Sequence, residues 1–463
     1  MSARQPVYVD RQMGDVRLSP NSNTGPVASR QQTANDDQQI CRENEWRMID
    51  SIGMQRLRIA IIGAGIGGLT LAIALRQRGL EAKVFEQASE LNEIGAAVAL
   101  SANSTRELRR LGVLDAITAV STEPTELIYR DWRDGHRIAA HPVQDGLRYQ
   151  KRFGAPFHGI HRADLQRVLS GALGGVGLHL GHRLTDLVDY EDTIGLEFAN
   201  GRSVQADLVI GADGVRSVVR RFVTGGEDAV YSGTSAFRGI VPAGRLLSLP
   251  NSRAVQFWMG PNAHLLHYPI GGGGEDVNFL AAVEGPAVWP HEDRWLTEVE
   301  PGEAAAAFKG WHPAVTEMVG AVEHKVRWGL FSVRPLLSWY RGRALLLGDA
   351  AHAMLPHHGQ GANTTIEDAV TLAELLAGAS PSELEAVMGR YQALRRSRTR
   401  KIQRSSRVTN DLLHLPDGAA LAERDRRVSR FPEDFGWIHE FDALRSVSEA
   451  GQMASPAETL QQE

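Results

Sequence analysis

The chain has 463 residues, long enough for two domains or for one large domain with an inserted sheet. Hydrophobic residues make up 43% and charged residues 23%, which is ordinary for a soluble globular protein, and the net charge of −5 gives no indication of nucleic acid or an anionic membrane as a partner. The single cysteine, Cys41, excludes an internal disulfide framework, a cysteine zinc site and a CxxC redox centre. Any redox chemistry must therefore come from a bound organic cofactor, and with no secretory signal visible the expected location is the cytoplasm.

The two ends of the chain are predicted to be disordered. Residues 1–55 are rich in Asn, Gln, Ser, Asp and Arg and have no sustained apolar period, so we expect a tail with no part in the chemistry. Residues 446–463 are expected to form a second disordered tail.

The most informative stretch runs from Arg58 to Glu86. A short apolar strand is followed at once by a glycine-rich turn, an apolar helix and a second strand that ends on Glu86. Gly63 lets the chain turn out of the strand, Gly65 lets a pyrophosphate approach the helix N-terminus, and Gly68 lets the helix pack against the strand. Glu86 comes about 20 residues later, where a carboxylate can accept the hydroxyls of an adenosine ribose.

This order of elements predicts a dinucleotide site. The alternative is a membrane span, because Ile59 to Leu75 carries no charge, but this run is at the short limit for a span and its glycines suit a strand-to-helix turn. The fingerprint alone leaves FAD and NAD open as the ligand.

The next segments predict further pieces of an α/β domain. Leu127 to His141 has the alternation of a short hairpin, and an amphipathic helix carries Leu165 to Leu173. A buried strand then ends in a polar turn at Asp213 and Gly214, with a helix over 215–222.

From 231 to 333 the pattern changes to strands and turns. Strands over 235–241, 254–259, 264–270 and 277–284 have the lengths and turn punctuation of an antiparallel sheet, which could cover one face of the cofactor as a substrate platform.

A third glycine-rich segment lies between Arg343 and Gly378. A buried strand ends at Asp349, and a loop with three glycines and two adjacent histidines precedes a helix. Thr364 and Glu367 fit a capping box, and the positive end of such a helix would stabilise an anionic ring placed over the loop.

Residues 381–445 are predicted to be helical. Arg395 to Arg407 is rich in arginine, which could indicate a nucleic-acid contact. The segment lacks interleaved aromatic residues and belongs to an acidic chain, so the interpretation we favour is a solvated helix face and no nucleic-acid partner.

Three separated motifs together resemble one family. The GAGIGG turn with Glu86, the GADG motif at 211–214 and the GDAAH motif at 348–352 are similar to those of single-component, class A flavoprotein aromatic hydroxylases. The HRADL, AFRG and GQGAN motifs resemble the salicylate hydroxylase and 3-hydroxybenzoate 6-hydroxylase branch. The resemblance covers about residues 57–443.

The resemblance implies an α/β fold with mixed α+β character. A Rossmann-like FAD-binding domain would comprise residues 56–230, with the short hairpin, and 334–380. The antiparallel sheet over 231–333 would be an inserted substrate domain, and residues 381–445 would form C-terminal helices.

The resemblance also implies which residues hold FAD. They come from all three glycine-rich segments and the loops between them: Gly63, Gly65, Gly68, Glu86, Ala97, Ala99, Arg162, Asp213, Asp349, Gly359, Gly361 and Ala362. Asp213 would link FAD to NADH or NADPH, which docks transiently as a co-substrate.

The inserted sheet supplies candidates for catalysis. Strand alternation predicts that His264 and Tyr268 share one face and that His267 lies on the other. The GPxxHxxxYP pattern implies that His264 assists deprotonation of a phenol, although a strand histidine could equally be a satisfied core residue. Arg238, in the AFRG strand, is a second catalytic candidate or a salt-bridge residue.

The flavin loop supplies further substrate candidates. With Tyr268 and His267, Pro356 and His357 are the predicted substrate-binding residues. Proline at 356 resembles salicylate-type members, where the 3-hydroxybenzoate branch has glutamine. His352, His357 and His358 with Asp349 could also suggest a metal, but Asp349 is needed for FAD, so no metal site is predicted.

The predicted function is NAD(P)H- and dioxygen-dependent hydroxylation of a phenolic or aromatic-acid substrate through a flavin hydroperoxide. One alternative is epoxidation or hydroxylation of a non-aromatic or polyketide-type metabolite, and another is a flavin-dependent metabolite sensor that is not an enzyme. The expected assembly is a monomer or homodimer, with no membrane or nucleic-acid partner.

Overall fold

The computed structural model describes residues 57–91, 97–144, 147–291 and 294–454. The predicted tail at 1–55 and residues 455–463 of the second predicted tail lie outside these residues. Within the described ranges, no helix is both long and apolar enough to cross a bilayer.

The first sheet is the core of the Rossmann-like part. Its six strands have the order β19-β20-β12-β1-β2-β8, and the central strands are parallel. Their bounds are β1 Ile59–Ile62, β2 Ala82–Phe85, β8 Leu178–His179, β12 Leu208–Gly211, β19 Tyr340–Arg341 and β20 Ala344–Leu346. Every residue of β1 is buried, as expected for a parallel strand covered on both faces.

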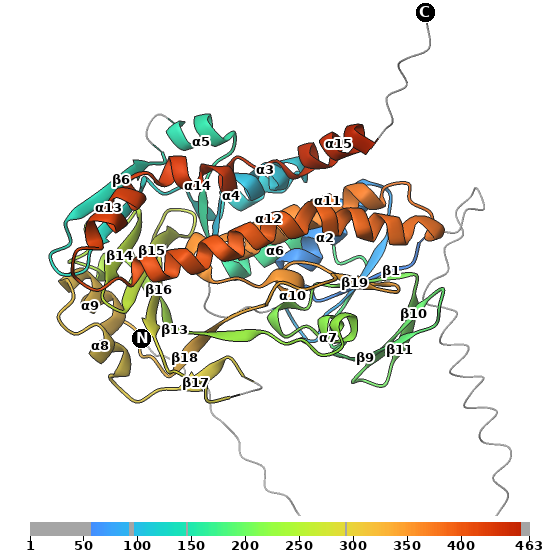
Figure 1. Cartoon of the computed structure of the whole chain (residues 1–463), viewed down its shortest axis with the longest axis horizontal. Coiled ribbons are helices and arrows are strands. Elements are labelled where there is room, and N and C mark those ends of the chain that lie inside the picture. Colours follow the sequence, from blue (N-terminus) through green and yellow to red (C-terminus); the bar gives the residue numbers. More distant parts are fainter. Residues whose placement is uncertain (1–56, 92–96, 145–146, 292–293, 455–463) are drawn as a thin grey trace, which may run out of the picture. The chain divides into compact units, whose positions relative to one another are not determined.

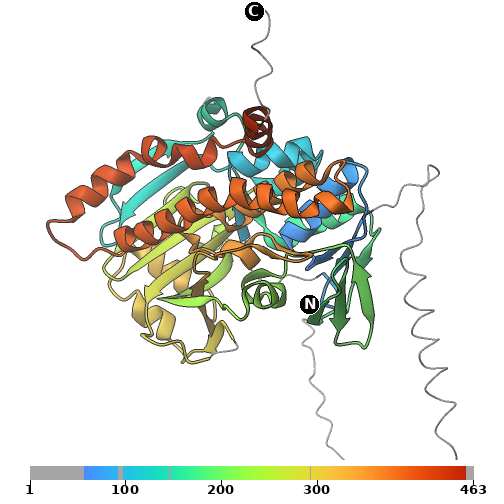
Figure 2. The same cartoon turned by 45° about the vertical axis from the view of Figure 1, so that its right-hand side comes forward.

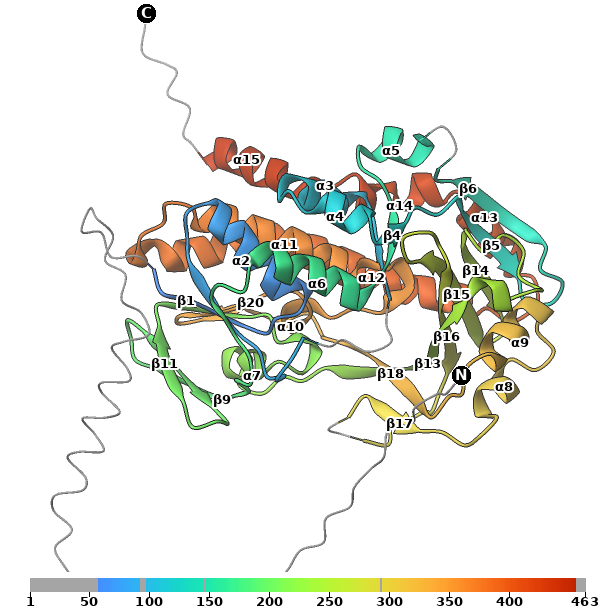
Figure 3. The same ribbon diagram turned by 180° about the vertical axis from the view of Figure 1, so that it is seen from behind.

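Helices and a small sheet cover the two faces. α2 (Ile66–Gln77), α6 (Arg162–Leu173) and α11 (Gln360–Leu376) lie on one face, and α7 (Val218–Thr224) lies on the other (Figure 1, Figure 3). A three-stranded sheet lies on the side of α7, with β9 Leu184–Asp189, β10 Ile194–Phe198 and β11 Ser203–Ala206.

A second three-stranded sheet joins this part to the substrate sheet. It contains β3 (Ala97–Leu100), β4 (Ser121–Thr122) and β7 (His158–His161), with α3 (Ala102–Arg110) and α4 (Leu114–Thr118) beside it. A Cβ on Gly159 of β7 would lie 2.2 Å from the carbonyl oxygen of Pro269, so the two sheets meet in close backbone contact.

The second large sheet has eight strands in the order β17-β18-β13-β16-β15-β14-β5-β6. The bounds are β5 Glu126–Asp131, β6 Arg137–Pro142, β13 Val230–Pro242, β14 Val255–Gly260, β15 Ala263–Ile270, β16 Asp276–Glu284, β17 Leu296–Glu298 and β18 Val326–Ser332. One face packs on α8 (Glu303–Ala307) and α9 (Pro313–Gly320) through a core that includes Phe237, Leu265 and Phe279.

The predicted hairpin forms but belongs to this second sheet. β5 and β6 pair with each other, and β5 also pairs in parallel with β14. The sequence analysis placed the hairpin with the first FAD-binding segment, because pairing between strands more than a hundred residues apart leaves no local signal.

The C-terminal helices run across both large sheets. α12 (Leu384–Leu413) lies along α11, and α13 (Leu421–Ser429) and α14 (Phe431–His439) follow near the hairpin with α5 (Arg148–Phe153) (Figure 2). α15 (Ala443–Ala454) extends into the stretch that was expected to be disordered from 446 onward, so that expectation is wrong for residues 446–454.

The arginine-rich stretch of α12 is not simply a solvated face. Arg395 is fully buried, where it donates to Asp368 and Glu367 at 2.6 Å each, and Arg398 donates to Glu367 at 2.7 Å. The same pairing explains why the predicted capping box is absent: α11 begins at Gln360, and the carboxylate of Glu367 is bound to α12 instead of to a helix N-terminus.

Candidate active site

The glycine-rich turn after β1 has the geometry of a phosphate cradle. Gly63 has a φ of +102°, and a Cβ on Gly68 would lie 1.9 Å from the carbonyl oxygen of Gly63, so α2 packs directly on the turn. Among the described residues, a Cβ on Gly65 would have no atom within 4 Å beyond its chain neighbours. Open space therefore lies beside the N-terminus of α2, where backbone N–H groups and the helix dipole favour an anion.

Two carboxylates organise the loops around this turn. One oxygen of Glu86 accepts from the backbone N–H of Ala64 at 2.8 Å, and the other accepts from that of Ala88 at 2.9 Å. Asp213 accepts from the Ser217 hydroxyl at 2.5 Å and from the Val218 N–H at 2.7 Å, which caps the start of α7. Burial raises the pKa of Asp213, and its hydrogen bonds oppose that shift.

The third glycine-rich segment reaches the same place. Asp349 begins α10 (Asp349–His352), and its Oδ1 lies 3.8 Å from where a Cβ on Gly361 would be. Burial lowers the pKa of Arg162 while the charge of Asp349 raises it, so these two side chains are electrostatic neighbours. A Cβ on Gly67 would lie 2.5 Å from Thr365 of α11, which places this segment against the first.

Asn363, within GQGAN, fastens the flavin loop to β3. Its Nδ2 donates to the carbonyl oxygens of Ala99 at 2.8 Å and Gly359 at 2.6 Å, and its Oδ1 accepts from the N–H of Ser101 at 2.9 Å. Ala97 begins β3, while Gly361 and Ala362 lie in the first turn of α11. Asn363 belongs to the GQGAN motif, but the sequence predicted no role for this side chain.

A cavity of about 670 Å³ lies over the first segment. Five of the predicted cofactor residues line it: Gly63, Gly65, Glu86, Arg162 and Asp213. The open space at Gly65, the carboxylate of Glu86 and the cation of Arg162 fit the diphosphate and ribose of a dinucleotide. This cavity can therefore hold the diphosphate and ribose part of FAD.

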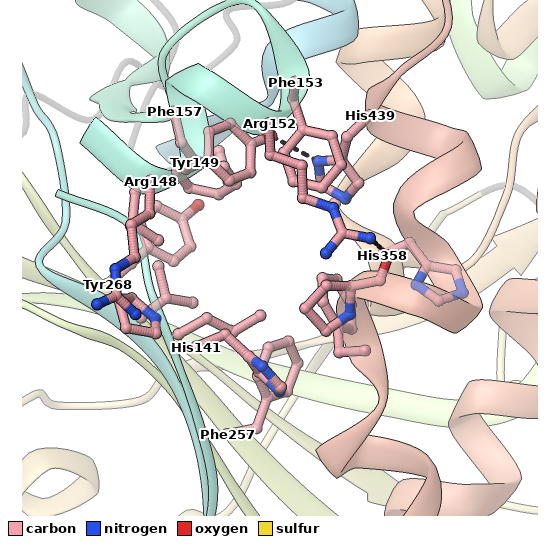
Figure 4. Close-up of a pocket in the computed structure, with 18 of the residues that line it drawn as sticks. His141, Arg148, Tyr149, Arg152, Phe153, Phe157, Phe257, Tyr268, His358 and His439 are labelled. Carbon is pink, nitrogen blue, oxygen red and sulfur yellow. Dashed lines mark hydrogen bonds between the residues drawn. The ribbon is translucent and has the colours of Figure 1, made fainter. Parts of the chain in front are cut away.

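A second cavity, here called the aromatic pocket, has a volume of about 250 Å³ and lies between the eight-stranded sheet and helices α5 and α14. Figure 4 shows its labelled side chains arranged around the central space. Six aromatic rings line it: Tyr149, Phe153, Phe157, Phe257, Tyr268 and Phe431. Ala99 and Gly359 also line it, so its wall includes the predicted flavin loop.

Histidines from separate elements meet at this pocket. His357, in η4 (Pro356–His358), lines the pocket, and neither of its ring nitrogens has a hydrogen-bond partner among the described residues. His264 is 1% exposed and lies behind His357, with the two ring centroids 5.1 Å apart. Burial and neighbouring histidines lower the pKa of both groups well below the usual value, so both are neutral at neutral pH.

Among the other predicted catalytic and substrate-binding residues, only some line the pocket. Tyr268 lines it, whereas His264, His267, Arg238 and Pro356 do not. His267 shares a strand face with Leu265, which packs toward α8 and α9, so the predicted alternation is confirmed and His267 is directed away from the pocket. Arg238 pairs with Leu280, which pairs with Leu266 of the pocket wall, so Arg238 lies on the pocket face of the sheet without lining the cavity. Burial lowers the pKa of Arg238, and the nearby Tyr268 opposes that shift.

Several lining residues were not identified from the sequence. Arg148 and Arg152 line the pocket from α5, and His141 and His439 line it from β6 and α14. Tyr149 accepts from the N–H of Ala102 at 3.0 Å and is hydrogen-bonded to Nδ1 of His439 at 2.6 Å. No motif marks these positions. Only His439 lies in a segment, residues 431–439, whose aromatic content could have indicated a pocket.

Two of the three histidines considered as metal ligands, His352 and His358, have hydrogen-bond partners of their own. His352 is hydrogen-bonded to Asp368 at 2.6 Å, and His358 to Ser405 at 2.9 Å.

Comparisons with known proteins agree with this geometry. Residues 56–406 match the family model described as FAD binding domain. The 3-amino-4-hydroxybenzoate 2-monooxygenase of Streptomyces platensis is 40% identical over 394 residues, covering 85% of this chain and 98% of the relative. The salicylate hydroxylase of Pseudomonas putida is 31% identical over 420 residues, covering 85% and 94% respectively. A solved salicylate hydroxylase substrate complex matches with a TM-score of 0.74 at 27% identity, covering 87% of this chain and 99% of that one, which confirms the predicted fold class and resemblance.

Proposed function

We propose that this chain, which belongs to the FAD binding domain family and is an FAD-dependent monooxygenase of the aromatic-hydroxylase type, acts on a single-ring hydroxylated aromatic acid. Enzymes of this type use NAD(P)H as co-substrate. FAD, when bound, supplies hydride acceptance and the activation of dioxygen, and the protein supplies binding, orientation and proton movement.

The observation that carries the proposal is His357 at the wall of the aromatic pocket. A buried polar group without a hydrogen bond costs about 1–3 kcal/mol, and neither ring nitrogen of His357 has a partner among the described residues. A substrate hydroxyl in the pocket would supply that partner. Because the imidazole is neutral, it can accept the phenol proton and leave a phenolate, which is a stronger carbon nucleophile.

The size and lining of the pocket support a small aromatic acid. Its volume of about 250 Å³ is below the roughly 300–1,000 Å³ typical of sites for drug-sized ligands, which favours one ring over a polyketide. Aromatic walls exclude water from the ring. Arg152 of α5 brings a positive charge to the pocket wall, where it also donates to the carbonyl oxygen of Pro432 at 2.8 Å and lies 3.5 Å from the carboxylate of Glu433. Arg148 lies one helical turn away, and the two positive charges favour a substrate carboxylate.

The supporting relatives point the same way. The relatives reported above are named for 3-amino-4-hydroxybenzoate and for salicylate, both single-ring hydroxylated aromatic acids. We propose the same substrate class for this chain.

The test is a panel of hydroxybenzoates, aminohydroxybenzoates and uncharged phenols given to the purified holoenzyme. We expect an aromatic acid to stimulate NAD(P)H oxidation with hydroxylated product in equal amount, and an uncharged phenol to do so only at higher concentration. Absence of stimulation by every acid, in a protein that retains FAD, would contradict the proposed substrate class.

A further inference from the structure

Three buried histidines lie in a row from the aromatic pocket toward the surface, with one hydrogen bond, between His264 and His414, among them. His357 lines the pocket, and its ring packs edge-on against that of His264 at 5.1 Å. His264 Nδ1 is 2.7 Å from Nε2 of His414, the residue that ends α12. These histidines come from η4, β15 and α12, so packing of three distant segments creates the row.

The outer end of the row lies near a surface carboxylate without being hydrogen-bonded to it. Nδ1 of His414 lies 3.7 Å from Oε1 of Glu284, and the Glu284 side chain is 52% exposed. His414 itself is 3% exposed. The row therefore has a buried inner end at the pocket and an acidic outer end at the surface.

Burial keeps the row neutral, and side chains of α12 surround it. His358 is fixed by the hydroxyls of Ser405 at 2.9 Å and Thr409 at 3.1 Å, and Asp411 of α12 acts on His414. Burial lowers the pKa of His414 to about 4. A neutral imidazole has one N–H donor and one acceptor nitrogen, so each ring can receive a proton on one side and release one on the other.

We propose that the row His357, His264 and His414, ending at Glu284, is the route by which the phenol proton of the substrate leaves the closed pocket. The substrate O–H bond breaks and a new N–H bond forms on His357. A proton passes from His357 to His264 after reorientation of the ring, from His264 to His414 through their hydrogen bond, and from His414 to Glu284 and then water. The phenolate stays in the pocket, and one proton appears in solvent for each substrate ionised.

This inference rests on the proposed function, and it assigns a role to His264 and His414, which packing alone does not. If the histidines had only a structural role, neutralising Glu284 would not change the rate of proton release. A proton route requires an acceptor at its outer end and slows when that acceptor is removed.

The test measures proton release without turnover. Wild-type FAD-loaded protein is mixed with 4-hydroxybenzoate, whose phenol is protonated in neutral solution, in weak buffer containing a pH indicator. Binding is followed separately by the change in flavin absorbance. We expect His414→Gln and Glu284→Gln to slow proton release by roughly tenfold or more relative to binding, because positioned acid–base groups contribute about 100-fold or more.

Controls separate this role from a structural one. Glu298→Gln replaces another exposed glutamate of the same sheet and should release the proton at the wild-type rate. Added imidazole buffer should restore the rate in Glu284→Gln, which a structural defect would not allow. If His414→Gln fails to retain FAD, the surface variant Glu284→Gln still decides.

Proton release at the wild-type rate in Glu284→Gln, with no response to buffer, would overturn the proton route. Failure of the proposed function is seen differently, as wild-type protein that oxidises no NAD(P)H in response to any aromatic acid.

Discussion

A Cβ atom added to Gly68 would lie 1.9 Å from the carbonyl oxygen of Gly63. The first turn of α2 therefore rests on the backbone that leaves β1, and no side chain fits between them. This contact fixes the helix N-terminus next to the open space at Gly65, which is the basis of the proposed cofactor site.

Substitution of Gly68 should affect both folding and FAD binding, whereas substitution of Gly65 should affect FAD binding alone. Gly68→Ala forces the helix off the strand, and we expect a loss of about 1–3 kcal/mol or more in the free energy of unfolding, together with loss of FAD. Gly65→Ala meets no protein atom within 4 Å and should fold normally while binding FAD weakly, since its methyl group occupies the space for the phosphates. Thermal unfolding and flavin absorbance measure both effects.

Gly171→Ala, at an exposed position of α6 with no described atom within 4 Å of the added Cβ, is the control: it should leave the FAD content unchanged and stabilise the helix by up to about 1 kcal/mol. Full FAD content in Gly65→Ala would contradict the placement of the diphosphate.

Arg395 of α12 should be essential for stability. Its guanidinium is fully buried between Glu367 and Asp368, so Arg395→Met leaves two buried carboxylates without this partner. Breaking a buried pair in this way costs about 3–5 kcal/mol, measured by denaturant unfolding. Arg400→Met, at an exposed position of the same helix, should have little effect, and equal stability of the two variants would refute the structural role.

Buried histidines should make the protein sensitive to acid. Burial lowers the pKa of His267 to about 3, so between this value and the ordinary 6.5 the unfolded state binds the extra proton. The contribution to stability is complete above the ordinary pKa and is lost as the pH falls, by about 1.4 kcal/mol per pH unit.

His267→Leu should flatten this dependence, because the ring nitrogens of His267 have no hydrogen-bond partner among the described residues. The measurement is the free energy of unfolding against pH for wild type and variant. Parallel curves on the acid side would show that His267 does not titrate as its burial implies.

Arg152 should contribute to recognition of the substrate carboxylate. Arg152→Met removes one cation from the pocket wall, and we expect KM for an aromatic acid to rise about tenfold, equivalent to about 1.4 kcal/mol, with kcat and FAD content little changed. The corresponding aromatic amide should show no such difference between wild type and variant. Lys151→Met, an exposed neighbour that does not line the pocket, is the control, and an equal rise in KM there would indicate a general charge effect.

The spacing of nearby residues was enough to predict the dinucleotide turn and the two faces of β15. Gly63, Gly65 and Gly68 have distinct backbone roles that the spacing predicts, and the two-residue period of a strand correctly separates His264 from His267. Both features depend on residues that are close together in the sequence.

Contacts between residues far apart in the sequence could not be predicted in this way. The partner of His264 is His414, 150 residues away, and the partners of Arg395 come from another helix. The aromatic pocket is closed by α5 and α14, which carry no motif that relates them to the sheet. The sequence therefore indicated the cofactor segments better than the substrate wall.

The most direct test of the account is the fate of molecular oxygen. FAD-loaded protein is supplied with NAD(P)H, the best aromatic acid of the panel and ¹⁸O₂, and the product is analysed by mass spectrometry. The account predicts one ¹⁸O atom in each hydroxylated aromatic product, with NAD(P)H consumed in equal amount. Oxidation of NAD(P)H that yields only labelled hydrogen peroxide and leaves every aromatic acid unchanged would contradict it.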